Sequence, residues 1–224
     1  MRRLWHWPID PRARTVRLAL GEKRCPFETI EALPWAPPHD FAEIAPGAEA
    51  PVLVDTSGEA KVNAVGTHAI IEYIEEAHPS PRLLPFIANE RAEARRLWRW
   101  SEESFSEVNA TLLTERVNQW VRRSKTTDTT TLRTGVHALK SKLSFLNALA
   151  ETRTYMAGRS LTIADLSIAA HLSAYDYFGD MPWDAAPELK DWYSRIKSRP
   201  SFRPILADKV EGTRPAKHYA DLDF

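Results

Sequence analysis

The sequence contains a single cysteine, Cys25, which excludes an internal disulfide and any metal site built from several cysteines. A lone thiol fits a reducing compartment. Long hydrophobic runs are also missing, since no stretch approaches the roughly 20 apolar residues of a membrane-spanning helix. Near the start of the chain, His6, Pro8 and Asp10 interrupt the apolar residues, so no secretion signal forms. We therefore expect a soluble, cytoplasmic protein without membrane insertion.

An excess of charge of one sign is absent as well, because 30 basic and 30 acidic side chains cancel. Such a chain has no long-range field that would attract nucleic acid or an anionic membrane, so neither is expected as a partner. Any charged binding surface must be local. The 224 residues suffice to bury a large core in one or two domains.

The first 78 residues mix strand patterns with helix patterns. Strand patterns occupy residues 4–7, 27–32, 51–54 and 60–65. Helix patterns occupy residues 14–23 and 67–77. The tetrapeptide DTSG between the last two strand patterns favours a tight turn, and hence an antiparallel hairpin. This order predicts a small open sheet with helices packed on it, forming a domain of residues 1–78.

Three prolines punctuate residues 79–88, and because proline cannot continue a helix interior, this segment is predicted to be a linker. The next domain, residues 89–206, lacks strand alternation. Its residues 89–122 form one long helical pattern, and residues 131–150 repeat apolar side chains every three or four positions, as a bundle helix does. The polar, Thr-rich residues 124–131 are expected to connect or fray these helices.

A further helix is predicted to begin at Thr162, which has the residue type of an N-cap. Asp165, three residues on, can reach back and complete a capping box. This motif is expected to stabilise the fold and to take no part in catalysis.

Five segments in this order resemble successive parts of the cytosolic glutathione transferases. They are RTVRLALGEKRCPFETIEA (residues 14–32), GAEAPVLVD, AIIEYIEE, LTIADLSIAAHL and LKDWYSRIKSRPSF. The resemblance covers about 200 residues. It implies an α/β plus all-α fold, with a thioredoxin-like N-terminal domain joined to a helical-bundle C-terminal domain, and commonly a homodimer.

The resemblance also implies that Pro51 is a cis-proline, and that the backbone edge beside it, here Val52, pairs with glutathione. The alternative is that Pro51 only shapes the sheet. At the start of the next helix, the family commonly holds the γ-glutamyl group with Glu or Gln followed by Ser, where this chain has Gly66 and Thr67. Thr67 can cap the helix and present N–H groups to a carboxylate, whereas Gly66 offers no side chain.

Family enzymes use Tyr, Ser or Cys to keep the glutathione thiol ionised, because a free thiol has a pKa of about 8.5. At the serine and cysteine positions this chain has Asp10 or Ala13, and neither can activate a thiol: a carboxylate repels a thiolate, and a methyl group donates no hydrogen bond. Thr15 is expected to face its own helical turn. His6, near the tyrosine position, is either a donor or an ordinary strand histidine. The glutathione-like subsite is thus predicted at Pro51, Val52, Thr67 and His6, with no catalytic residue, no metal and no cofactor, unless glutathione still binds.

Two features are candidate partner surfaces. Trp35 lies in the proline-rich segment LPWAPPH, where it is either an exposed protein-binding anchor or folded over the sheet or a dimer interface. Arg91, Arg95 and Arg99 recur every four residues and form a basic stripe. The stripe either receives an acidic partner or is a solvated face paired with nearby glutamates.

Residues 207–224 are predicted to be a C-terminal tail, because Gly212 and Pro215 break helix. Its end combines aromatic and acidic side chains, which suit docking onto a partner; the alternative is that the tail packs on its own domain. The docking candidates are Tyr219, Asp221, Asp223 and Phe224.

The segments RRLWHWPIDP, LPWAPP and HYADLDF resemble a glutathione-transferase-like group of alphaproteobacterial cell-division proteins that bind the tubulin-like polymer FtsZ. This resemblance implies a non-catalytic homodimer at the division site that bundles or curves FtsZ filaments, signals to septal wall synthesis and engages other division proteins through its tail. Two hypotheses compete with it: a glutathione-dependent transferase acting on small electrophiles, and a sensor that binds glutathione without turnover.

Overall fold

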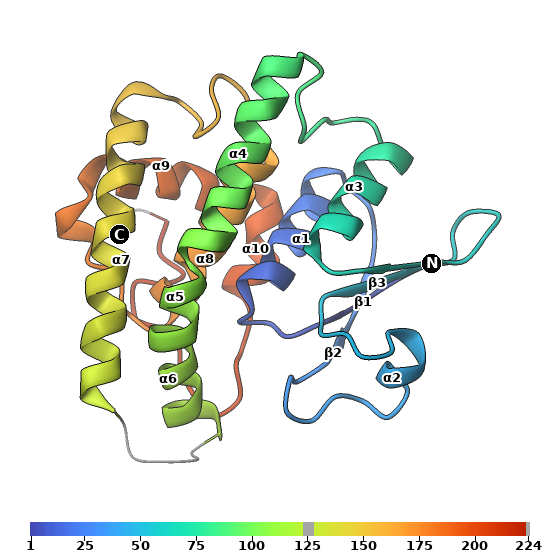
Figure 1. Ribbon diagram of the computed structural model, residues 1–224, viewed down its shortest axis with the longest axis horizontal. Coiled ribbons are helices and arrows are strands. Elements are labelled where there is room, and N and C mark those ends of the chain that lie inside the picture. Colours follow the sequence, from blue (N-terminus) through green and yellow to red (C-terminus); the bar gives the residue numbers. More distant parts are fainter. Residues whose placement is uncertain (123–127, 223–224) are drawn as a thin grey trace.

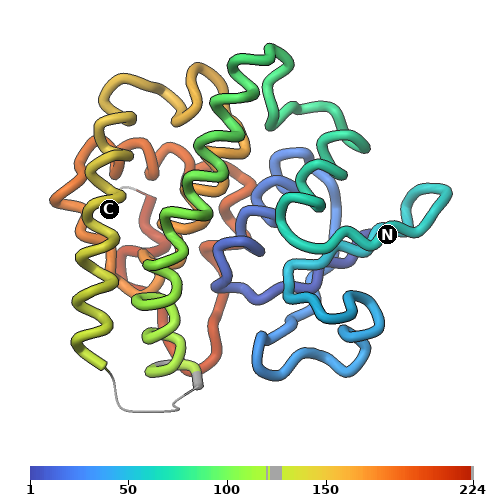
Figure 2. The backbone as a smooth tube through the Cα atoms, viewed as in Figure 1, coloured from blue at the N-terminus to red at the C-terminus, as the bar shows by residue number. Residues whose placement is uncertain are grey.

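The computed structural model describes residues 1–122 and 128–222, with a strand-containing part followed by a helical part (Figure 1). The first part consists of β1 (Arg2–His6), α1 (Pro11–Glu22), β2 (Glu28–Glu31), α2 (Phe41–Ile44), β3 (Val52–Asp55), β4 (Val62–Val65) and α3 (Thr67–Ala77). The predicted strands and helices of this part are all present. Figure 2 shows the chain leaving them, in cyan, for the helices drawn in green to red.

The sheet has the strand order β2-β1-β3-β4, in which β1 pairs in parallel with β2 and antiparallel with β3, and β4 closes the predicted hairpin. Side chains alternate between its faces. Leu4 and Leu53 join the main core under α1 and α3, whereas Trp5, Val52 and Val54 form a smaller core with Phe41 of α2. This arrangement confirms the predicted thioredoxin-like domain.

The helical part follows the linker. It consists of α4 (Ala88–Ser104), α5 (Ser106–Val108), a π-helical segment (Asn109–Leu113), α6 (Thr114–Arg116), a second π-helical segment (Val117–Arg122), α7 (Thr129–Thr152), α8 (Ile163–Tyr177), α9 (Pro187–Lys197) and α10 (Arg203–Leu206), with 3₁₀ turns at Trp183–Ala185 and Pro200–Phe202. The expected single helix over residues 89–122 is therefore interrupted at Phe105, and from Asn109 onward it consists of two π-helical segments separated by α6.

Close packing accompanies the π-helical segment. A Cβ atom at Gly135 of α7 would lie 2.6 Å from the Cβ of Leu112 and 2.8 Å from its backbone nitrogen, so only glycine lets the two helices approach this far. Asp128 accepts hydrogen bonds from the backbone N–H groups of Thr130 and Thr131 and so starts α7. Residues 124–127 of the predicted Thr-rich connection lie outside the described residues.

The two parts share one core, because α1 packs against α8. The capping box predicted at the start of α8 is present: the backbone N–H and the hydroxyl of Thr162 both donate to Asp165 at 2.9 Å. The linker is held by Glu75, whose carboxylate accepts from the backbone N–H groups of Leu83 and Leu84 and pairs with Lys23 at 2.6 Å. Both domains are thus fixed relative to one another.

Candidate functional site

A cavity of about 1180 Å³ opens between the two parts of the chain. Its first wall comes from the sheet domain: the start of α1, the connection between β2 and β3, and the start of α3. Its second wall comes from α4, the π-helical segments and α8. The polar side chains around it are Asp10, Arg12, His39, Glu49, Thr67, His68, Glu102, Ser106, Asn109, Thr114, Asn118 and His171.

The position where the family places its serine or cysteine lies at the start of α1, where this chain has Asp10 and Ala13. Asp10 is the N-cap of α1, and its Oδ1 accepts from the backbone N–H of Arg12 at 3.1 Å and from Arg12 Nε at 3.3 Å. Burial raises the pKa of Asp10 against the opposing charge of Arg12. Ala13 is fully buried, and Thr15 donates to the carbonyl of Pro11, in its own helical turn. None of these side chains can donate to a thiolate in the cavity.

His6 does not line the cavity, so its predicted place in the glutathione-like subsite is wrong. The side chain is buried, and burial, followed by the nearby charges of Arg17 and Arg14, lowers its pKa to about 3. A neutral imidazole enclosed behind α1 is an ordinary strand histidine. The physical reason is the alternation of side chains along β1: His6 lies on the same face as Leu4, toward the main core and α1, whereas Trp5 lies on the opposite face.

The Ala50–Pro51 peptide bond is cis, as the resemblance implied. Val52, however, offers no free backbone edge, because β3 lies inside the sheet and Val52 pairs with Trp5 on one side and Val65 on the other. The residue that reaches the cavity wall is Ala50, while Pro51 and Val52 lie behind it. Of these three residues, only Ala50, which precedes the proline, lines the cavity.

The start of α3 contributes Thr67 and His68 to the cavity wall. Gly66, with a φ of 81°, is the N-cap, so Thr67 occupies the first helical position and does not cap the helix as predicted. The Oγ1 atom of Thr67 is buried and has no hydrogen-bond partner among the described residues. Backbone N–H groups at a helix start favour an anion, so this end of the cavity keeps part of a carboxylate subsite.

His68 connects the two walls. Its ring stacks on Trp98 of α4 at a centroid distance of 4.2 Å, and its Nε2 lies 3.3 Å from Glu102. Glu102 also accepts from the indole N–H of Trp98 at 3.2 Å, and burial raises the pKa of this carboxyl against the attraction of His68. The place of Glu102 in the cavity wall was not predicted from the sequence, where this residue was counted among the glutamates that could pair with the arginines of α4.

Trp35 stands at the rim of the cavity. Its ring meets Trp7 edge-on at 5.2 Å, and 36 % of the residue is exposed. One side of the indole therefore packs on the domain and the other side faces outward, and its role as a protein-binding anchor stays a prediction.

The basic stripe on α4 is largely neutralised. Arg95 pairs with Glu72 of α3 at 2.9 Å and Arg99 pairs with Glu103 at 2.7 Å, while Arg91 donates to the linker carbonyls of Pro85 and Phe86. Exposed pairs of this kind contribute little to stability and leave little field for an acidic partner. The pairs formed by Arg95 and Arg99 fit the second alternative, a solvated helical face whose arginines pair with nearby glutamates.

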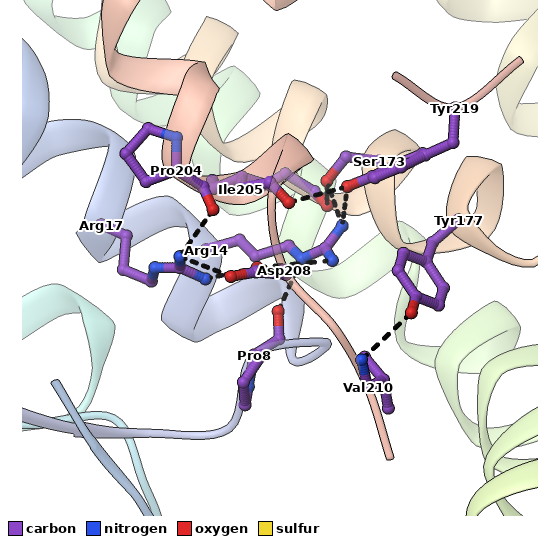
Figure 3. Close-up of polar contacts among 11 residues, drawn as sticks. Pro8, Arg14, Arg17, Ser173, Tyr177, Pro204, Ile205, Asp208, Val210 and Tyr219 are labelled. Atoms are coloured by element: carbon purple, nitrogen blue, oxygen red, sulfur yellow. Dashed lines mark hydrogen bonds and ion pairs between the residues drawn. The ribbon is translucent and has the colours of Figure 1, made fainter. Parts of the chain in front are cut away.

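The C-terminal segment packs on the protein, which makes the docking role predicted for Tyr219 wrong. Tyr219 is fully buried; its hydroxyl accepts from Arg14 Nη1 at 3.1 Å and donates to the carbonyl of Ile205 at 3.3 Å (Figure 3). Burial raises its pKa to about 12. Asp221 is exposed, but its backbone carbonyl accepts from the buried amine of Lys197 at 2.7 Å. Asp223 and Phe224 lie outside the described residues.

The same segment is tied to α1 by a second arginine that sequence reasoning did not single out. Arg17 forms a bidentate pair with Asp208, with N–O distances of 2.6 and 2.8 Å, and Arg14 donates to Ser173 of α8 and to the carbonyl of Pro8 (Figure 3). Two basic residues three positions apart, on a helix that otherwise faces the core, are the signal that marks them, because a buried guanidinium requires partners.

The described residues were also compared with the requirements of a membrane-spanning helix and of a metal site. No described helix has the length and apolar composition needed to cross a membrane. No group of three or more His, Cys, Asp or Glu side chains in the described ranges is arranged to hold a metal ion.

Comparison with known proteins agrees with this geometry. Residues 4–82 match the family model "Glutathione S-transferase, N-terminal domain", and residues 110–200 match "Glutathione S-transferase, C-terminal domain". Over its full 224 residues the chain is 46% identical to FtsZ-localized protein A of Caulobacter vibrioides and covers 98% of that protein.

Two solved structures cover the whole chain. FzlA from C. crescentus superposes with a TM-score of 0.95 at 46% identity, covering 100% of this chain and 99% of that one. A glutathione S-transferase from Rhodospirillum rubrum superposes with a TM-score of 0.91 at 40% identity and full coverage of both chains. With both family models matched in order and a full-length relative at this identity, the chain belongs to the glutathione S-transferase family.

Proposed function

We propose that this protein associates with FtsZ filaments at the division site as a non-catalytic member of its family. The observation that carries the proposal is the full-length similarity, at 46% identity, to a protein named for its localisation with FtsZ. The finer expectation is that the protein bundles or curves the filaments, engages other division proteins and thereby regulates septal wall synthesis. A homodimer would present two copies of one binding face, and so could bridge two filaments.

The cavity supports the non-catalytic part of this proposal. Asp10 is engaged as a helix cap, Ala13 offers only a methyl group, and His6 lies behind the cavity wall. A thiol held in this cavity would meet no side-chain hydroxyl, thiol or imidazolium at the positions that the family uses. The side chains by which the family lowers a thiol pKa below that of a free thiol, about 8.5, are thus not found at those positions, and Arg12, the cation of this wall, is engaged by Asp10 and Glu49.

The direct test is co-sedimentation of the purified protein with FtsZ assembled with GTP, followed by negative-stain microscopy of the pellet. We expect the protein to pellet with bundled or curved filaments and to stay in the supernatant when FtsZ is held unassembled with GDP. If the protein stays in the supernatant with both nucleotides, the proposal is wrong.

One observation favours glutathione-dependent transfer to small electrophiles as a second candidate. In the wall of the cavity, the hydroxyl of Thr67 has no hydrogen-bond partner among the described residues and lies at the start of α3, where an anion is favoured. Calorimetric titration with glutathione, followed by conjugation assays with a panel of electrophiles, separates the possibilities. Turnover supports the transferase, binding without turnover supports a glutathione sensor, and the absence of binding rejects both.

A further inference from the structure

The last described turns of the chain close over a buried lysine. The side chain of Lys197 in α9 is fully buried, and its Nζ donates to the backbone carbonyls of Asp221 at 2.7 Å and of His218 at 3.4 Å. Residues 216–222, which supply these carbonyls, are here called the terminal strap. Because a buried ammonium group requires partners, the burial of Lys197 depends on the strap, and the strap is held in turn by Lys197.

One carboxylate connects the terminal strap to the body of the protein. Asp176 of α8 is fully buried, and its Oδ1 accepts hydrogen bonds at 2.9 Å from the indole N–H of Trp183 and from Nε2 of His218. Its Oδ2 accepts no hydrogen bond from a described residue and lies 3.8 Å from Nζ of Lys197. The strap residue His218 and the buried Lys197 therefore face the same carboxylate, which supplies negative charge beneath the strap.

The closed strap leaves the charge of Lys197 only partly balanced. Burial lowers the pKa of this amine from 10.5 to about 8, although the charges of Asp176 and Asp221 act in the opposite direction. A lowered pKa of a base means that its surroundings disfavour the charged form. The closed position of the strap thus carries an electrostatic cost at neutral pH, and Asp176 keeps that cost from being larger.

An exposed connection precedes the strap. Within residues 211–215 only Thr213 is partly buried, and its hydrogen bonds reach no farther than the carbonyls of Val210 and Arg214. Gly212 has a φ of 81°, in the region that favours glycine. Because the hydrogen bonds of this connection are local, the strap can swing away without breaking those within α8 or α9.

We propose that the terminal strap is a charge-controlled latch, which opens as one unit about residues 211–215 and stays closed because Asp176 balances the ammonium group of Lys197. The closed strap holds the end of the chain against α8 and α9. The open strap exposes Lys197 and lets the chain beyond Gly212 extend from the body of the protein. None of residues 216–222 lines the cavity, and the latch depends neither on a cavity ligand nor on filament association.

Hydrogen exchange of the full-length protein, measured by NMR at neutral pH, tests the latch. The backbone N–H groups of Ala216, Tyr219 and Asp221 are hydrogen-bonded in the closed strap. We expect them to share one protection factor, lower than that of the amides in the middle of α8, because a segment that opens locally exchanges before the core does. In Asp176→Asn, which keeps an acceptor oxygen but removes the charge, strap protection should fall about tenfold or more while α8 protection stays unchanged.

A second substitution separates the effect of charge from that of packing. Adding Lys197→Met to Asp176→Asn removes the unbalanced ammonium group, so strap protection should return to within about threefold of that of the unmodified protein. Lys217→Ala, which replaces an exposed lysine of the strap, is the matched control and should leave strap protection unchanged.

If Asp176→Asn does not fold, His218→Ala replaces it, because this side chain is partly exposed and belongs to the strap itself. It should likewise lower the protection of the strap and leave that of α8 unchanged. The inference is wrong if the strap and α8 lose protection by the same factor, if neither variant affects the strap, or if Lys197→Met does not restore closure in Asp176→Asn. An equal loss would mean that the strap opens only when the whole protein unfolds.

Discussion

Replacing Tyr219 tests whether the C-terminal segment belongs to the folded core. The phenol ring is fully buried and meets Tyr177 edge-on at 5.1 Å, and the hydroxyl bonds to Arg14 and to the carbonyl of Ile205. In Tyr219→Phe the ring remains, Arg14 keeps its bond to Ser173, and the carbonyl of Ile205 keeps its bond from the backbone N–H of Asp208, so the cost is the two lost hydrogen bonds of the hydroxyl. We expect the free energy of unfolding to fall by about 1–2 kcal/mol.

In Tyr219→Ala a cavity replaces the ring as well, and loss of a buried aromatic side chain costs about 3–5 kcal/mol. Single domains are stable by only about 5–15 kcal/mol, so this variant loses a large share of the total. The assay is urea unfolding followed by tryptophan fluorescence and circular dichroism. Leu222→Ala, in the same segment but 41 % exposed, is the matched control and should change stability by no more than about 0.5 kcal/mol.

The reasoning is refuted if Tyr219→Ala is as stable as Leu222→Ala, because the segment would then contribute nothing to the core. The result also decides how tail variants are interpreted in division assays. If Tyr219→Ala unfolds as expected, loss of filament binding in that variant reports on folding and carries no information about docking.

Three further predictions concern other parts of the fold. Asp165→Ala removes the acceptor of the backbone N–H groups of Met156 and Thr162, so thermal unfolding should show a loss of about 2–4 kcal/mol, whereas an unchanged melting temperature would reject the role of the capping box. His6 titrates at a pKa of about 3 in the folded chain and near the ordinary 6.5 when unfolded, so the unfolded state binds the extra proton and stability falls as the pH drops from 6.5 toward 3. His6→Gln should therefore reduce that slope by about 1.4 kcal/mol per pH unit, and an identical slope would show that His6 is not buried in its neutral form. Trp35→Ala should weaken co-sedimentation with FtsZ about tenfold or more if its exposed side is an anchor, and wild-type affinity would restrict Trp35 to packing on Trp7.

The fold could be predicted from the sequence because its signals are local. Alternating side chains gave the strands, the DTSG turn gave the hairpin, and Thr162 with Asp165 gave the start of α8. The interruption of the long helix at Phe105 carried no such signal, because the residues after it have ordinary helical propensity. The first π-helical segment lies where α7 approaches closely at Gly135, and this approach is a tertiary contact.

The candidate site was predicted less well, since its residues meet only after folding. That Asp10 and Ala13 stand where the family has serine or cysteine could be read from single positions. The burial of His6 could not, because it depends on which face of β1 is covered by α1, which is a tertiary contact. The burial of Tyr219 was missed for a similar reason, because its partner Arg14 lies 205 residues away in the sequence. The sequence of an acidic, aromatic segment does not distinguish an exposed position from a buried one.

Helix α1 links the two features that distinguish this chain. Asp10 and Arg12, at the start of the helix, form part of the cavity wall. Arg14 and Arg17, which lie about one and two turns further along, hold the C-terminal segment. In an enzyme of this fold the first turn of α1 would be committed to activating a thiol. Here its acid is engaged with Arg12, so this turn presents no serine, cysteine or tyrosine to a thiol. The same helix holds the C-terminal segment through the bond from Arg14 to Tyr219 and the bidentate pair between Arg17 and Asp208, so its role in this chain is to anchor the end of the fold.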